Sequence, residues 1–204
     1  MIGSRDAGDP RVNPPQRADG EAEAVGGAAP RPVLARLLAR YPERPVRAVF
    51  MLVNSFVAIA LLAGLAMVTA NPFVFPSLGP TAFLCFFTPT APSASPRSTI
   101  VGHAIGIVCG YGALLLVGLE HAPAAIVTGV DGARILAASL SLACTGALMI
   151  VLGVAHPPAG ATTLIVSLGI VTRPAHLLIL EAAVVVLTLY ALAINRLLGV
   201  DERP

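Results

Sequence analysis

The sequence contains no lysine, and its permanent positive charges are carried by arginine alone. A nucleotide-binding loop of the form G-x-x-x-x-G-K-[ST] needs a lysine, so ATP-driven transport by this chain alone is not expected. The three cysteines are widely spaced within apolar runs, which argues against a disulfide framework or a C-x-x-C metal site. The four histidines do not form an i, i+4 pair with an acidic partner. We therefore predict no enzymatic activity, no catalytic residue, no metal, no cofactor and no nucleic-acid partner.

Charged residues are also scarce, at 12% of the chain, whereas hydrophobic residues make up 56% and the mean hydropathy is +0.82. These values lie outside the range of ordinary soluble domains. Four runs carry almost no charge, and each is long enough for a helix to cross a hydrocarbon core of about 30 Å. They cover residues 48–70, 98–119, 135–155 and 177–194. This pattern predicts an all-α membrane protein with four long transmembrane helices in a lipid bilayer.

The part of the chain before the first run divides into two segments. Residues 1–32 are rich in Gly, Pro, Ala and Asp and predict a disordered tail. Residues 33–45 place leucines on one helical face and arginines on another, as an interfacial helix does; a charged flank of the first span is the alternative. Five arginines are clustered just before the first span, at residues 31–47, so the positive-inside rule predicts a cytoplasmic N-terminus in the cell (cytoplasmic or inner) membrane. Residues 199–204 form a short C-terminal tail.

A short motif occurs twice. Pro76, Gly79 and Thr81 repeat as Pro157, Gly160 and Thr162 in the pattern P-x-x-G-x-T, each time between two long apolar runs. The repetition predicts two structural repeats, residues 46–119 and 131–198, each with a short membrane helix broken by proline and glycine.

If both short helices complete their crossings, the repeats are inverted and the N-terminal ends of the short helices meet near the midplane. Helix N-termini present amide hydrogens and a partial positive charge, so this meeting point favours an anion. The arginines do not decide whether the short segments cross or re-enter. Crossing places Arg97 and Arg196 on one side with Arg134 and Arg173 on the other, whereas re-entry exchanges the sides of Arg97 and Arg134.

Two stretches carry a family signature: FPSLGPTAFLCFFTPTAPSASPRSTIVGHAIG, residues 75–106, and AHPPAGATTLIV, residues 155–166. Together they resemble the HPP family of integral membrane proteins, over about residues 44–198. The family is described as having at least four transmembrane helices, and its functionally assigned plant members are similar to chloroplast nitrite transporters. The resemblance implies a secondary transporter or channel for a small inorganic anion such as nitrite. On the recurring pattern fall Pro76, Ser77, Gly79, Pro96, Arg97, Gly102, His103, His156, Pro157, Pro158, Gly160 and Thr162.

Two features of this chain depart from the pattern of the family. Pro80 stands where relatives often have a small residue, which affects the geometry of the first motif. Some relatives append cytoplasmic regulatory domains, and we expect none here.

The candidate anion site consists of the polar and irregular residues of both motifs. We predict that hydroxyls and exposed amides bind the anion, and that His156 donates a hydrogen bond or a proton. Packing between helices is the alternative role for the small residues, and capping of broken backbone is the alternative for His156. The predicted substrate-binding residues are Ser77, Gly79, Thr81, His156, Pro157, Pro158, Gly160, Thr162 and Thr163. Ionisable groups inside or beside the spans, namely His103, Glu181 and Arg97, are candidates for a proton or ion pathway, with an interfacial or topological role as the alternative.

Two other classes of function stay open at this point. A non-transporting membrane scaffold or assembly factor would use the same glycines for partner binding. A haem- or metal-binding redox module would use His103, His156 and His176 as ligands. The membrane part is small for an alternating-access carrier, so we expect a homo-oligomer.

Overall fold

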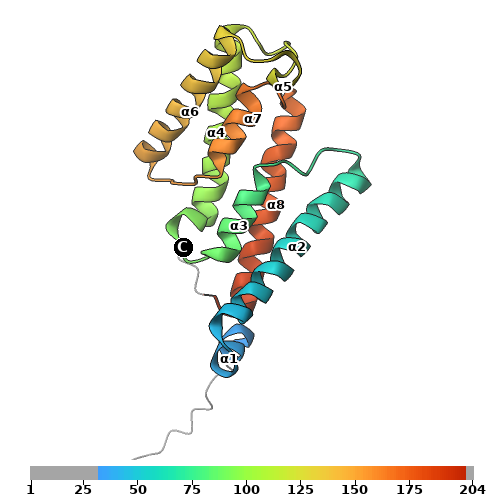
Figure 1. Ribbon diagram of the computed structural model, residues 1–204, viewed down its shortest axis with the longest axis vertical. Helices are drawn as coiled ribbons and strands as arrows, with labels where there is room; N and C mark the ends of the chain where they lie inside the picture. The colour runs from blue at the N-terminus through green and yellow to red at the C-terminus, as the bar shows by residue number, and fades with distance from the viewer. Residues whose placement is uncertain (1–31, 201–204) are drawn as a thin grey trace, which may run out of the picture. The chain divides into compact units, whose positions relative to one another are not determined.

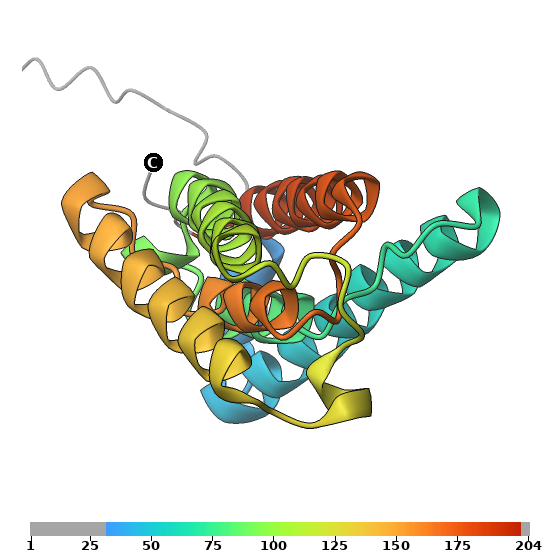
Figure 2. The same ribbon diagram turned by 90° about the horizontal axis from the view of Figure 1, so that it is seen from above.

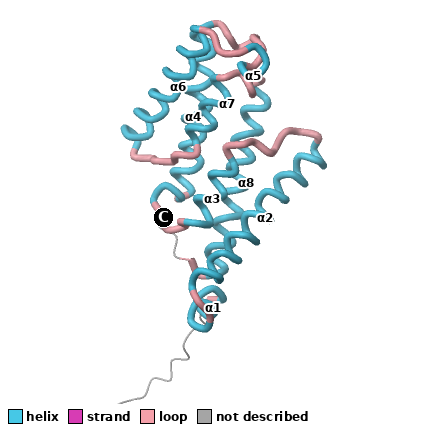
Figure 3. The backbone as a smooth tube through the Cα atoms, viewed as in Figure 1, coloured by secondary structure: helices cyan, strands magenta, loops and turns pink. Residues whose placement is uncertain are grey.

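The computed structural model describes residues 32–200, and within this range every regular element is a helix (Figures 1 and 3). The elements are α1 (Val33–Arg40), α2 (Glu43–Thr69), α3 (Leu78–Phe87), the 3₁₀ turn η1 (Pro92–Ala94), α4 (Pro96–Val117), α5 (Ala125–Thr128), α6 (Gly132–Leu152), α7 (Ala159–Ser167) and α8 (Pro174–Leu198). Four of them, α2, α4, α6 and α8, are long and apolar enough to cross a membrane. The predicted all-α class with four long spans and two short helices is confirmed. The predicted tails at residues 1–32 and 199–204 lie almost wholly outside the described residues.

The ends of the long helices follow from local sequence signals. Ser95 and Asp131 precede α4 and α6, and their side chains accept hydrogen bonds from the backbone N–H groups of Ser98 and Arg134 at 3.2 and 2.8 Å. Proline occupies the first position of α4 and of α8, where no amide hydrogen is needed. The long helices begin two to five residues before the predicted runs, because hydropathy detects the apolar stretch and not the polar start of the helix.

Each short helix packs against long helices of both halves of the chain. The helix α7 packs against α6 and against α4 of the first half, and α3 packs against α2 and against α8 of the second half. The central helices α4 and α8 also pack against each other (Figures 1 and 2). Exchanging the two halves reproduces this set of contacts, as a twofold repeat requires. The repeat itself stays a prediction.

The two short helices run in opposite directions from a common level (Figure 1). The C-terminal part of α3 lies beside the end of α8, where Asn195 Nδ2 donates to the Cys85 carbonyl at 3.1 Å. The end of α7 lies beside the loop after α4, where the Ala125 amide donates to the Leu168 carbonyl at 2.9 Å. Their N-terminal ends therefore face the middle of the helix assembly.

Contacts between the elements also show at which end of the helix assembly each loop lies. The helix α1 contacts both α2 and α8, so the start of the membrane part and the end of α8 lie together. The start of α4, which carries Arg97, and the end of α8, which carries Arg196, lie toward this end, whereas the starts of α6 and α8, where Arg134 and Arg173 occur, lie toward the other (Figure 1). This is the distribution expected when both short helices complete their crossings.

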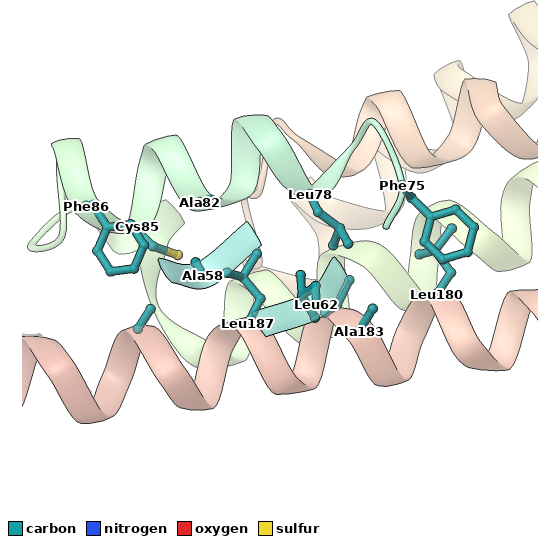
Figure 4. Close-up of a cluster of buried hydrophobic side chains, with 12 residues drawn as sticks. Ala58, Leu62, Phe75, Leu78, Ala82, Cys85, Phe86, Leu180, Ala183 and Leu187 are labelled. Carbon is teal, nitrogen blue, oxygen red and sulfur yellow. The ribbon is translucent and has the colours of Figure 1, made fainter. Parts of the chain in front are cut away.

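The largest apolar cluster joins α2, α3 and α8 (Figure 4). Leu62, Leu78 and Leu180 are fully buried there, and Phe86 contacts Phe50 with its ring centroid at 6.1 Å. Because lipid tails are as apolar as leucine, these contacts stabilise the fold through close packing more than through transfer out of water.

Candidate functional site

A polar cluster lies where the N-terminal ends of α3 and α7 meet α4. At its centre is His103, which has 0% exposure. Its Nε2 lies 2.9 Å from Thr81 Oγ1 on α3, and its Nδ1 lies 2.7 Å from Thr162 Oγ1 on α7. Thr81 and Thr162 are the corresponding threonines of the two P-x-x-G-x-T motifs. The structure therefore brings both motifs together on the two nitrogens of one imidazole ring.

His156 is the second histidine of the cluster, and it lies in the irregular segment between α6 and α7. It is also fully buried, and its ring centroid is 4.9 Å from that of His103. Its Nδ1 is 2.7 Å from the Ser93 carbonyl oxygen, and its Nε2 is 3.4 Å from Thr81 Oγ1. One hydroxyl, that of Thr81, thus lies between the two rings.

The hydrogen-bond partners assign the tautomers of the two rings. The Ser93 carbonyl can only accept, so His156 Nδ1 carries the hydrogen and its Nε2 is an acceptor. The Thr81 hydroxyl donates to the Ser77 carbonyl at 2.9 Å and accepts from His103 Nε2. His103 Nδ1 then accepts from the Thr162 hydroxyl.

The backbone around His156 is set by its neighbours in the sequence. Gly153 ends α6 in the left-handed region at φ 64°. Pro157 disfavours a helical conformation at the preceding residue, so the chain runs irregularly to the first turn of α7. The His156 carbonyl accepts from the Ala159 amide at 3.0 Å. Irregular backbone of this kind persists at membrane depth only where protein groups satisfy it, as they do here.

Three glycines of α4 bring this helix close to His156 and α7. A Cβ at Gly102 would lie 2.7 Å from Cβ of His156, and one at Gly106 would lie 2.8 Å from the Ala159 carbonyl oxygen. At Gly110 it would lie 2.8 Å from the Thr163 carbonyl oxygen. The spacing G-x-x-x-G-x-x-x-G is a known signal for close packing of membrane helices. This spacing is visible in the sequence and is the signal from which the close approach of α4 could have been predicted.

The predicted substrate-binding residues divide into two groups. The side chains of five of them are fully buried, and they are Ser77, Thr81, His156, Thr162 and Thr163. Gly79, Pro157 and Pro158 instead line an open groove of about 670 Å³ together with Pro80, Phe83, Leu84 and Ala161. The first turns of both short helices therefore form the groove wall, and the hydroxyls lie behind that wall. Gly160 is half-buried, and a Cβ there would contact only Leu142.

Thr163 does not join the histidines. Its hydroxyl donates to the Ala159 carbonyl at 3.1 Å and lies 2.9 Å from Thr145 Oγ1 of α6. Thr145 was not foreseen from the sequence, and neither was Ser93, whose carbonyl orients His156. Both contacts join segments that are separated in the sequence, and no local sequence pattern predicts that these segments lie close together.

The expectation of exposed amides at the short helices needs correction. The amides of Ala159, Gly160 and Ala161 donate to the carbonyls three residues before them at 3.0 to 3.1 Å. In α3, Leu78 and Gly79 form the same kind of turn at 3.0 and 3.4 Å. A tight first turn satisfies the N–H groups that an ideal helix start leaves free. Hydroxyl groups and the helix dipoles are therefore the available attractions for an anion.

One hydroxyl of the cluster has no hydrogen-bond partner. Ser77 occupies the position before α3, is fully buried and makes no side-chain cap. Buried polar groups are nearly always paired, so an unpaired hydroxyl at this place is a candidate contact for a ligand.

The other ionisable candidates lie apart from the cluster. Arg97 is exposed, and its Nη2 donates to the Leu152 carbonyl at 3.4 Å. Both carboxylate oxygens of Glu181 on α8 are buried and have no hydrogen-bond partner. Of the three predicted pathway residues, only His103 contacts the motifs.

The motif geometry agrees with the comparison with known families. The model of the HPP transmembrane region matches residues 41–204. The chain belongs to the HPP family. Among curated proteins and among solved structures, no match to the chain was found. In this HPP protein the motif His156-Pro157-Pro158 thus forms the entry to α7 and delivers its histidine to the polar cluster.

The surroundings of the histidines are relevant to the alternative function, a redox module that binds haem or a metal. Within residues 32–200, no three His, Cys, Asp or Glu side chains are grouped so that they could hold a metal ion. His103 and His156 are adjacent, and the remaining contacts of their rings are with threonine hydroxyls and a backbone carbonyl.

Proposed function

We propose that this integral membrane protein is a secondary transporter or channel for a small inorganic anion such as nitrite. One observation carries the proposal: the threonines of both repeated motifs bind the same buried histidine at the N-terminal ends of two opposed short helices. Broken helices whose N-terminal ends point at a common place near the midplane are a recurrent arrangement of transporter sites.

The groups at this place suit an anion with a single charge. The dipoles of α3 and α7 both present their positive ends, and no acidic side chain hydrogen-bonds to the cluster within the described residues. The unpaired Ser77 hydroxyl can donate to an oxyanion. These features favour an anion over a cation.

The polar cluster is closed in this conformation, because its side chains are fully buried. An anion in the groove meets the first turns of α3 and α7 at Gly79 and Pro157. We infer that movement of these two turns relative to each other connects the groove with the hydroxyls behind it. We propose a transport role rather than an enzymatic one, and a homo-oligomer whose mass in detergent can be measured by light scattering.

The test is flux of nitrite into proteoliposomes that contain the purified protein, with nitrate, chloride and formate as competitors. We expect saturable flux that Gly79→Leu lowers by about tenfold, because the leucine side chain occupies part of the groove through which the anion enters. A Cβ at Gly79 meets nothing within 4 Å, so the larger side chain enters the groove without displacing backbone. Gly112→Leu is the matched control, because Gly112 is exposed on α4 and is equally unobstructed.

Absence of flux for all four anions, with folded protein in the vesicles, would overturn the proposal. The scaffold alternative would then be preferred, and it predicts that Gly79→Leu alters binding to a partner protein instead.

A further inference from the structure

We propose that His156, Thr81 and His103 form a proton relay, so that the proton is the co-substrate of anion transport. The inference rests on the proposed function and names its coupling ion. It starts from the position of one hydroxyl, Thr81 Oγ1, which lies 2.9 Å from Nε2 of His103 and 3.4 Å from Nε2 of His156.

The hydrogen bonds of this cluster can all be oriented so that each group donates to the next, from Thr162 to the Ser93 carbonyl. The Thr162 hydroxyl donates to His103 Nδ1, and His103 Nε2 donates to Thr81. The Thr81 hydroxyl can rotate from the Ser77 carbonyl to His156 Nε2, and His156 Nδ1 donates to the Ser93 carbonyl. A chain with this polarity passes a proton by successive short transfers, because every member has one donor and one free acceptor.

The transfer steps balance. A proton first adds to Nδ1 of His103 from the side of Thr162, so that His103 carries hydrogens on both nitrogens and has the positive charge. The Nε2–H bond of His103 then breaks as its hydrogen moves to Thr81 Oγ1, while the O–H bond of Thr81 breaks as its hydrogen moves to Nε2 of His156. His103 is left neutral with its hydrogen on Nδ1, and His156 has the positive charge until its Nδ1 hydrogen leaves on the side of Ser93. Both rings then carry their hydrogen on the other nitrogen, and return of these hydrogens to Nε2 of His103 and Nδ1 of His156 completes the cycle.

The two ends of the relay lie on different sides of the cluster. Ser93 belongs to η1, which packs against α3 and α4, and Thr162 belongs to α7. The groove of about 570 Å³ that borders His156 also includes Pro92 and Ser98 from this region. A proton released at His156 therefore has a short route out of the helix assembly, whereas Thr162 faces the interior.

Few other charged groups surround the relay. The short elements α3, η1 and α7 contain no Asp, Glu, Arg or His. On the packed long helices, the charged side chains nearest in sequence are Arg97 on α4, Arg134 on α6 and Glu181 on α8, and none of them is hydrogen-bonded to either ring. A positive charge on the histidine pair is thus compensated by a bound anion more readily than by a protein carboxylate.

Anion binding and histidine protonation stabilise each other, so the movements of the anion and the proton are coupled. A protonated histidine attracts the anion, and the anion stabilises the protonated histidine. After the anion leaves, the proton is no longer held and passes along the relay. The expected result is symport of one proton with one anion of single charge.

The test uses the full chain in proteoliposomes with the membrane potential clamped at zero by potassium and valinomycin. A gradient of about one pH unit, alkaline inside, is imposed, and uptake of nitrite and of nitrate is followed together with the pH of the lumen. Nitrate is included because its strong acid does not cross lipid in protonated form. We expect the wild type to accumulate the anion up to about tenfold, the ratio that one pH unit supports for one-to-one coupling.

The variants compare coupling with anion flux in the same protein. Thr81→Val and His103→Gln are expected to lose accumulation driven by the pH gradient, and this loss should exceed any fall in the rate of anion equilibration at symmetrical pH. Thr81→Ser keeps the hydroxyl and should retain accumulation. Thr188→Val is the matched control, because the buried Thr188 hydroxyl bonds only the Val184 carbonyl of its own helix, at 2.7 Å.

Two results would overturn the relay and leave the proposed function intact. One is anion flux in the wild type that does not depend on the pH gradient. The other is accumulation driven by the pH gradient that is unchanged in Thr81→Val. Absence of any anion flux would overturn the proposed function and the relay together.

Discussion

Single hydroxyl groups at the motif threonines hold the polar cluster together. Thr162→Val removes the donor to His103 Nδ1 and leaves a fully buried acceptor without a partner. An unsatisfied buried polar group costs about 1–3 kcal/mol, so we expect a clear fall in the thermal unfolding temperature in detergent. Thr188→Val should cost less, because the carbonyl that Thr188 binds is already part of its helix. Equal losses in the two variants would contradict a special role for Thr162.

A buried arginine provides the second residue-scale prediction. Arg134 is 2% exposed, and its guanidinium donates to the carbonyls of Pro123 at 2.7 Å, Ser167 at 3.3 Å and Ala122 at 3.4 Å. It therefore closes the C-terminal end of α7, where a positive charge also complements the helix dipole. Replacing Arg134 removes its hydrogen bonds to all three carbonyls.

We expect Arg134→Met to destabilise the fold by about 1.5–3 kcal/mol, the range for a hydrogen bond to a charged group. Arg97→Met is the control, since Arg97 is exposed and makes a single bond of 3.4 Å, and its effect should stay within about 0.5 kcal/mol. Denaturation followed by circular dichroism in detergent measures both. A small effect at Arg134 would mean that water replaces its guanidinium at this end of the assembly.

The motif residues were predictable from the sequence, and their partners were not. Proline, glycine and threonine at matching offsets identified Thr81 and Thr162, because a broken helix needs these residue types whatever packs against it. That both threonines would bind His103 depends on how the N-terminal ends of α3 and α7 are placed beside α4 in the folded protein. No residue near His103 in the sequence carries that information.

At the scale of elements, the glycine face of α4 sets the distance to α7. Gly106→Ala would place a Cβ 2.8 Å from the Ala159 carbonyl oxygen and 2.9 Å from Thr163 Oγ1, so backbone must shift. We expect a loss of about 1–3 kcal/mol from overpacking. Gly112→Ala, on the same helix with nothing within 4 Å, should be neutral or stabilising by up to about 1 kcal/mol.

The measurement is the unfolding temperature of the two alanine variants in the same detergent. A loss at Gly106 with none at Gly112 would locate the effect in the contact with α7. Similar values for both variants would show that α4 adjusts its position freely, and the close approach would then have no energetic importance.

Helix limits were foreseen to within a few residues, while the state of the first turns was not. Proline and glycine placed a short helix at each P-x-x-G-x-T motif, and the helices begin within these motifs, at Leu78 and Ala159. The tight turns that occupy the amides of Gly79 and Gly160 depend on bonds between carbonyls and amides three residues apart. Propensity alone does not distinguish such a turn from an open helix start.

At the scale of the whole molecule, the positive-inside rule did not show on which side of the membrane Arg97 and Arg134 lie. Crossing and re-entry of the short helices agree with the arginine distribution equally well. The packing favours the arrangement in which both short helices cross, since α8 returns beside α1 and the loop of α5 lies against the end of α7. The two ends of the assembly are thereby distinguished within the described residues without reference to charge.

This arrangement predicts the labelling pattern of single cysteines in a background where Cys85, Cys109 and Cys144 are replaced by alanine or serine. Arg40→Cys before α2 and Arg196→Cys near the end of α8 should react with a membrane-impermeant maleimide from the same side. Thr128→Cys in α5 should react only from the opposite side.

All three positions are exposed, so a difference in labelling reflects the side of the membrane and not burial. Intact and inverted vesicles of the same preparation provide the comparison, and detergent-solubilised protein gives the full extent of reaction for each cysteine. Labelling of Thr128→Cys and Arg40→Cys from the same side would mean that α3 returns to the side from which it came. The opposed helix starts would then not meet near the midplane, and the anion site proposed between them would lose its geometric basis.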